Sequence, residues 1–338
     1  MRDYRFDVAR VVCMTIIVAY VHLYAYIHPE VRSAYFIPMC ATITDACLGL
    51  FTFVSGYLLG MKYQFGGPEE KNIWSFYKKR LLRIIPLFVL AAVCLWLIGF
   101  NGKQETINGV ICISPFVKCR PQTLWYIPVI LYCYLITPLV SRKSMNWKVC
   151  VCVGIMVVLL VLEKKIPSID KRLAFNVFFY LTGIITSTCF DWKMKFSNGL
   201  YVKIAWVLVF LVVLIVGHKH SNFHDLWFKR FASGIGVIAL LFICEWVSDF
   251  LFGRGQQEGA AKKSSFVNVS ASIIKYVSYA SMAVYMFHRL FFWLGEKIFD
   301  PSSNSIKWGY MVLIVFPVMC ILSYYIQKTY DIIVGNKK

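Results

Sequence analysis

Two ionisable residues in the first long apolar run of the chain are of types that can act on a substrate within a membrane. Arg10 lies near the start of this run, and His22 follows 12 residues later, which is about 18 Å along a helix. A neutral imidazole can remove a hydroxyl proton, and a guanidinium can bind an anion. Because ionisable groups are costly in hydrocarbon, we expect both residues to be functional. Headgroup anchoring of Arg10 and simple packing of His22 are the alternatives.

A second group of cations precedes Pro86. Arg80 and Arg83 are three residues apart, so a helix places them on one face, where both can hold phosphate groups. The adjacent Lys78 and Lys79 are explained by the excess of positive charge that membrane proteins carry on the cytoplasmic side. Arg83 lies inside an apolar run, where a fixed charge needs a partner, so we assign it to ligand binding.

Polar groups also occur in the second apolar run. Ser55 and Tyr57 flank Gly56 and offer hydroxyls where the glycine permits a close backbone approach. They are candidate substrate contacts, although small residues are also common where membrane helices pack. Asp45, in the same run, has no partner evident from the sequence or else caps backbone groups at the membrane boundary.

Aromatic and histidine residues supply the remaining candidates. Trp125 and Tyr126 can stack on a sugar or anchor a helix at the membrane interface. Tyr285 and His288 lie in a late polar and aromatic helix, at a depth comparable to that of His22. We expect the two histidines to face one cavity, and Tyr285 and His288 to contact substrate, with an aromatic belt as the alternative.

The composition determines what kind of elements position these residues. Hydrophobic residues make up 59% of the 338 residues and charged residues 16%, which excludes an ordinary soluble fold. The net charge of +19 is scattered through short loops without a nucleic-acid-binding module, so we expect no nucleic acid partner. The partners that we expect are instead the lipid bilayer and anionic ligands.

Continuous apolar runs predict an all-α integral membrane protein with about ten transmembrane helices in a single domain spanning 1–338. The predicted spans are 7–27, 40–60, 81–100, 123–140, 149–162, 174–190, 201–217, 231–251, 273–294 and 308–326. Lys and Arg are more frequent in the loops on the side of the N-terminus, which places both termini in the cytoplasm. A glycine-rich stretch at about 252–272 predicts a flexible loop between spans eight and nine.

Two further patterns involve residues that can bind metal or form a disulfide. His218, His220 and His224 have no spacing typical of a zinc site, so we expect no metal. Cys112 and Cys119 share a loop, and a disulfide between them is the less favoured alternative to free thiols.

Taken in order, five segments resemble the membrane-bound acyltransferase-3 family, the bacterial multi-pass O-acyltransferases of glycans. They are Asp7–Arg10 with His22, Leu50–Tyr57, Phe76–Pro86, Leu124–Tyr126 and Ser278–His288. The resemblance covers Arg2 to about Ile136 and Ile273 to Tyr330, and the middle of the chain shares only its hydropathy.

This resemblance implies functional roles for Arg10, His22, Arg80 and Arg83. One feature differs: eleven residues separate Arg10 from His22, one more than is usual in the family. An extra residue rotates a side chain by about 100° around an ideal helix. Either a π-bulge restores the orientation of His22 or the pair has a different geometry.

The resemblance leads us to expect an enzyme of the bacterial inner membrane that moves an acyl group from cytoplasmic acyl-CoA, most simply acetyl-CoA. The expected acceptor is a hydroxyl of a cell-surface glycan or lipid-linked sugar. His22 and Arg10 are the candidate catalytic residues, with His22 as base or as a transiently acylated nucleophile. Arg80 and Arg83 are the candidate donor-binding residues. The alternative function is a polysaccharide or lipid exporter, or another transporter.

Overall fold

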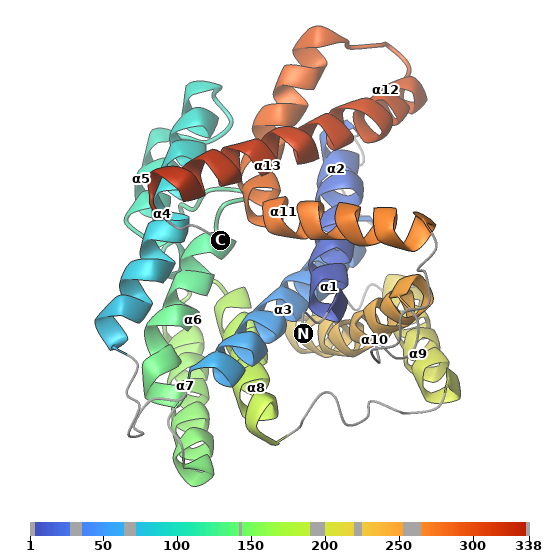
Figure 1. The fold of residues 1–338 in the computed structure, drawn as a ribbon. Helices are drawn as coiled ribbons and strands as arrows, with labels where there is room; N and C mark the ends of the chain where they lie inside the picture. The colour runs from blue at the N-terminus through green and yellow to red at the C-terminus, as the bar shows by residue number, and fades with distance from the viewer. Residues whose placement is uncertain are drawn as a thin grey trace. The chain divides into compact units, whose positions relative to one another are not determined.

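The computed structural model describes residues 4–27, 36–63, 72–141, 144–189, 200–219, 225–252 and 265–335 (Figure 1). Within these ranges the chain forms helices and no strand, which confirms the expected all-α class.

The helices follow one another along the chain with short connections. They are α1 (Tyr4–Thr15), the π-helical segment η1 (Ile16–His22), α2 (Leu23–Ile27), α3 (Phe36–Lys62), α4 (Ile73–Leu97), α5 (Lys103–Val110), the 3₁₀ turn η3 (Ser114–Phe116), α6 (Tyr126–Val140), α7 (Met145–Lys165), α8 (Arg172–Cys189), α9 (Leu200–Lys219), α10 (Leu226–Phe252), α11 (Ser265–Ile298), α12 (Asn304–Tyr310), the π-helical segment η6 (Met311–Val315) and α13 (Phe316–Ile333).

Several of these helices have the length and composition of membrane spans. In the described part of the chain six are long and apolar enough to cross a membrane: Met39–Lys62, Ile73–Leu97, Met145–Lys165, Leu200–Gly217, Leu226–Phe252 and Asn304–Ile333. The apolar helix Tyr126–Val140 is shorter. Exposed large side chains on α9, such as Leu208, Val212 and Ile215, are stable where lipid rather than water surrounds them. The protein is therefore a multi-pass membrane protein, while the number of ten spans and the cytoplasmic termini stay predictions.

The predicted flexible loop at about 252–272 is shorter than the sequence indicated. Helix α11 begins at Ser265, so the last part of the predicted loop is helical, and Ser272 donates a hydrogen bond to the Asn268 carbonyl one turn earlier. Serine and asparagine compete with backbone hydrogen bonds, and for this reason their clustering resembles a loop. Here the helix begins before the apolar run that starts at 273, and residues 253–264 lie outside the described ranges.

One compact unit comprises Met1–Phe51 and Asn198–Ile333. Within it, buried side chains of α9 and α10, including Phe210 and Ala232, pack against Met39 and Ile43 of α3. Figure 1 shows α9 and α10 side by side. Helix α1 packs against both α10 and α11, so the helix that carries Arg10 and η1 is enclosed by the late helices of the chain.

Acidic side chains in this unit have cationic partners on neighbouring helices. Asp45 of α3 pairs with Lys229 of α10 at 2.9 Å. Buried Glu245 of α10 pairs with Lys203 of α9 at 2.9 Å and more distantly with Arg5 of α1. The partner of Asp45, which the sequence did not reveal, is thus far along the chain, and pairing offsets part of the cost of burying the charge.

The second unit comprises Thr52–Ser197 and Val334–Lys338, and glycines bring two of its helices together. A Cβ added to Gly56 of α3 would lie 2.1 Å from the Tyr180 carbonyl oxygen of α8. In return, a Cβ on Gly183 of α8 would lie 2.3 Å from the Phe53 carbonyl oxygen of α3. The glycine between Ser55 and Tyr57 therefore serves helix packing, which was one of its two predicted roles.

Replacing either glycine with alanine should separate α3 from α8. Because the new methyl group meets backbone rather than a movable side chain, Gly56→Ala and Gly183→Ala should each lower stability by roughly 1–3 kcal/mol. Thermal unfolding of the detergent-purified protein measures this effect. The matched control is Gly154→Ala in α7, where an added Cβ meets nothing within 4 Å. Equal behaviour of all three variants would show that the contact is not tight.

Candidate functional site

A π-helical turn orients His22. The first helix changes from α to π geometry over Ile16–His22 and returns to α geometry at Leu23. A π turn accommodates one residue more than an α turn over the same rise, so it absorbs the extra residue between Arg10 and His22. The π geometry that the sequence raised as one alternative is therefore present, while a restored orientation of His22 relative to Arg10 stays a prediction.

The π turn brings His22 to His288 of α11. Nδ1 of His22 lies 2.9 Å from Nε2 of His288. The ring centroids are 4.9 Å apart with an interplanar angle of 17°, so the nearly parallel rings approach edge to edge and not face to face. His288 is fully buried, whereas His22 is half-buried. The two histidines therefore lie together, and the prediction that they face one cavity stays a prediction.

Residues of α11 make further contacts with this pair. Nδ1 of His288 lies 2.8 Å from the carbonyl oxygen of Tyr285, one turn earlier. The guanidinium of Arg289 donates a hydrogen bond to the backbone carbonyl of His22 at 3.4 Å. Tyr285 thus lies close to the histidines and contacts His288 through its backbone carbonyl, while contact of its side chain with substrate stays a prediction.

A polar group that the sequence did not single out lies one to two turns beyond the histidines. Phe292 packs edge-on against His288 and also contacts Tyr26. The Tyr26 hydroxyl donates to Glu296, whose carboxylate also pairs with Lys307 of α12. These residues were missed because tyrosine, glutamate and lysine near a predicted helix end read as ordinary interfacial residues.

Arg10 has an acidic partner on its own helix. Its guanidinium lies 3.7 Å from the carboxylate of buried Asp7. Asp7 also accepts a hydrogen bond from the Ser278 hydroxyl of α11 at 2.7 Å. The Asp7 carboxylate thus links α1 to α11 and contacts the guanidinium of Arg10. The three-residue spacing from Asp7 to Arg10 was the sequence signal for this contact.

In the second unit, Arg80 of α4 lies among aromatic rings. Its guanidinium carbon is 5.8 Å from the Tyr63 ring centroid and 5.9 Å from those of Phe76 and Tyr134. Such distances allow cation–π attraction. Its Nε is buried and has no hydrogen-bond partner among the described residues.

Arg83 lies one turn further along α4 and is half-buried. No carboxylate in the described ranges forms an ion pair with Arg80 or Arg83. The local structure follows from the sequence, since Asn72 caps the start of α4 by accepting from the backbone N–H groups of Trp74 and Ser75. Helix α4 thus presents two cations without acidic partners in the described part, an arrangement suited to an anionic ligand.

Ser55 and Tyr57 belong to the packed half of α3. Tyr57 is buried and Ser55 is half-buried. They lie in the other compact unit from His22, and their contact with substrate stays a prediction.

Trp125 has a cationic partner that the sequence did not indicate. The Arg172 guanidinium lies 3.5 Å from its ring centroid, and both Trp125 and Tyr126 are buried. A sugar that stacks on this face of Trp125 must displace Arg172. The rings of Trp125 and Tyr126 contact each other as a T-shaped pair, with centroids 6.1 Å apart.

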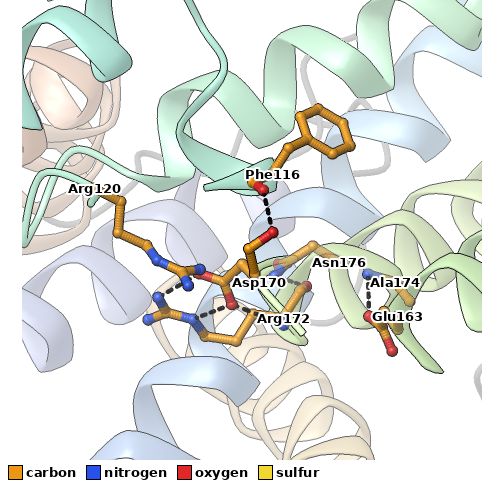
Figure 2. A network of polar contacts seen from close by, with 8 residues as sticks. Phe116, Arg120, Glu163, Asp170, Arg172, Ala174 and Asn176 are labelled. Atoms are coloured by element: carbon orange, nitrogen blue, oxygen red, sulfur yellow. Dashed lines mark hydrogen bonds and ion pairs between the residues drawn. The ribbon is translucent and has the colours of Figure 1, made fainter. Parts of the chain in front are cut away.

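Arg172 belongs to a polar network around the loop between α7 and α8 (Figure 2). Asp170 accepts from Arg172 at 2.9 and 2.6 Å and pairs with Arg120 at 2.5 Å. Ser168 donates to the Phe116 carbonyl at 2.9 Å, which ties this loop to η3. Although burial alone would raise the pKa of the Asp170 carboxyl, Arg172 and then Arg120 hold that pKa below its usual value.

The remaining candidates from the sequence are the cysteines and histidines considered for a disulfide or a metal site. Cys112 and Cys119 carry free thiols. Among the residues that the structure describes, no group of histidine, cysteine, aspartate or glutamate side chains has the arrangement of a metal site. The His218, His220 and His224 side chains lie outside the described set.

Comparison with known proteins gives one match. A family model described as an acyltransferase domain, that of the acyltransferase-3 family, matches residues 3–328. No curated protein and no solved structure matches the chain.

The Asp170 network should make stability depend on pH. A carboxyl whose pKa is lowered by folding stabilises the protein fully above its unfolded pKa of about 3.9. That contribution declines as pH falls through the lower pKa of the folded state. Asp170→Asn should therefore cost roughly 1.5–3 kcal/mol at pH 7, and the difference from wild type should shrink as the pH falls below 4. Thermal unfolding of both proteins across this range provides the measurement, and a pH-independent difference would contradict the expectation.

Proposed function

Because the chain belongs to the acyltransferase-3 family, we propose that it is a membrane O-acyltransferase that moves an acetyl group from cytoplasmic acetyl-CoA. The proposed acceptor is a hydroxyl of a cell-surface glycan or lipid-linked sugar, and the proposed location is the bacterial inner membrane. The observation that carries this proposal is the half-buried His22, paired with buried His288 inside an apolar helical unit of an acyltransferase chain. A hydrogen-bonded imidazole in such surroundings is suited to proton transfer.

The proposed chemistry requires a base on the acceptor side. His22 removes the proton from the sugar hydroxyl as the oxygen attacks the thioester carbonyl carbon. A C–O bond forms, the C–S bond breaks, and His22 returns the proton to the departing CoA thiolate. An acyl-histidine route uses the same unprotonated ring nitrogen, but as the nucleophile.

The donor carries phosphate groups, and we assign them to the arginines. Arg80 and Arg83 have the planar, forked donors that match phosphate oxygens, and they have no acidic partner in the described ranges that would compete. Arg10 is a weaker candidate for this role because Asp7 already shares its charge. We place Arg10 instead as a cation whose position Asp7 and Ser278 fix on the His22 helix.

Removing the imidazole should abolish turnover without preventing donor binding. His22→Ala should lower the rate of acetyl transfer by roughly 100-fold or more, since general base catalysis contributes about that much. The assay measures CoA release together with base-labile acetyl groups on the glycan fraction of membranes. Tyr20→Phe is the matched control, because it changes an exposed side chain of the same π-helical segment.

Wild-type turnover of His22→Ala would remove the catalytic assignment. Movement of a glycan across vesicles without consumption of the thioester would support the exporter alternative in place of the enzyme.

The arginines of α4 should affect donor affinity. Arg83→Ala should raise the KM for acetyl-CoA by about 10-fold or more, as expected for the loss of a charge-assisted hydrogen bond. Lys79→Ala is the matched control, since Lys79 is an exposed cation of the same helix. An equal change in both variants would indicate a general effect of surface charge and not a phosphate contact.

A further inference from the structure

We infer that His288 is a positioning residue that holds His22 in the tautomer with its hydrogen on Nδ1 and its lone pair on Nε2. The inference rests on the proposed function, because it concerns the nitrogen with which His22 would accept a proton. It adds a role for His288 other than contact with the substrate.

The backbone carbonyl of Tyr285 determines which nitrogen of His288 carries the hydrogen. Its Nδ1 faces the carbonyl oxygen of Tyr285 at 2.8 Å. A carbonyl oxygen can only accept, so Nδ1 of His288 carries the hydrogen and donates it. A neutral His288 then has an unprotonated Nε2. A second proton would add an unhydrated positive charge to a fully buried ring next to Arg289 in the chain.

The position of the hydrogen on His288 determines which nitrogen of His22 carries a hydrogen. The unprotonated Nε2 of His288 is an acceptor, and it lies 2.9 Å from Nδ1 of His22. That contact is a hydrogen bond only if His22 Nδ1 donates. The Nε2 of neutral His22 is therefore the nitrogen with the free lone pair, and the hydrogen bond made by one ring nitrogen determines the state of the other.

The two rings differ in burial, and this difference separates their roles. His288 is completely enclosed, so a substrate cannot reach it in this arrangement, whereas His22 keeps part of its surface exposed. Arg289, the next residue on α11, binds the His22 backbone carbonyl at 3.4 Å. Adjacent residues of α11 thus hold the backbone and the ring of His22, which keeps the π turn and the imidazole in one orientation.

The arrangement also serves the proton balance of the proposed reaction. When Nε2 of His22 accepts the hydroxyl proton, the ring becomes an imidazolium whose Nδ1–H still donates to His288. A charged donor makes a stronger hydrogen bond than a neutral one. His288 therefore stabilises the protonated His22 without exchanging a proton itself, until His22 passes its proton to the CoA thiolate.

A spectroscopic measurement tests the tautomer directly. In histidine-labelled ¹⁵N protein purified in detergent, the His22 signals, assigned by their loss in His22→Ala, should show a protonated Nδ1 and an unprotonated Nε2. His288→Leu removes the acceptor, so His22 should shift toward a mixture of the two tautomers. A wild-type His22 protonated on Nε2, or an unchanged His22 in His288→Leu, would overturn the inference.

A kinetic comparison tests the consequence, with two substitutions at one position. His288→Leu should lower kcat for acetyl transfer to the membrane glycan fraction by roughly 10- to 100-fold while leaving the KM for acetyl-CoA unchanged. His288→Gln should recover most of this loss, because its amide oxygen can accept from His22 Nδ1. Equal kcat values for the leucine and glutamine variants would contradict the inference even where the leucine variant is poorly folded.

The two proposals fail in distinguishable ways. If the wild-type protein transfers no acetyl group, the proposed function fails while the tautomer measured by ¹⁵N shifts still stands. If His22→Ala is inactive but His288→Leu has the wild-type kcat, the enzyme assignment holds and the positioning role is wrong.

Discussion

Several polar side chains within these helices are tolerated because they have partners on other helices. A charged or hydrogen-bonding group inside an apolar bundle has no water to satisfy it, so its partner must come from the protein. Asp7 is shared by Arg10 and Ser278, Asp45 pairs with Lys229, and His22 pairs with His288. Each partnership joins an early helix to a late one. The same contacts that offset the cost of burial therefore also determine which distant segments of the chain lie together.

Much of the fold was predictable because lipid imposes a simple requirement on sequence. Continuous apolar runs predicted the helices, and each predicted span falls mostly on a helix, although residues 98–100 and 123–125 lie outside α4 and α6. The helix ends were less predictable, since α11 begins within a serine-rich stretch that resembles a loop. Helix boundaries depend on local hydrogen bonds, which hydropathy does not report.

The candidate site was predictable in its residues but not in its contacts. The spacing of Arg10 and His22 identified an irregularity, yet spacing alone could not decide between a π turn and a different geometry. The proximity of His22 and His288 was expected from their similar depth, whereas the choice of ring nitrogens depends on a backbone carbonyl that no sequence pattern marks. Trp125 is a further example, because its partner Arg172 is the first residue of α8, more than forty residues later in the chain.

The contact between α3 and α8 affects how the second unit can move. At Gly56 and Gly183 one helix backbone rests directly on the other, with no side chain between them. Side chains can change rotamer and so let helices slide, but two backbones in van der Waals contact cannot adjust in that way. The two helix segments should then shift together as a rigid pair. Any opening within this unit that admits or releases a bulky molecule must occur along other helix boundaries.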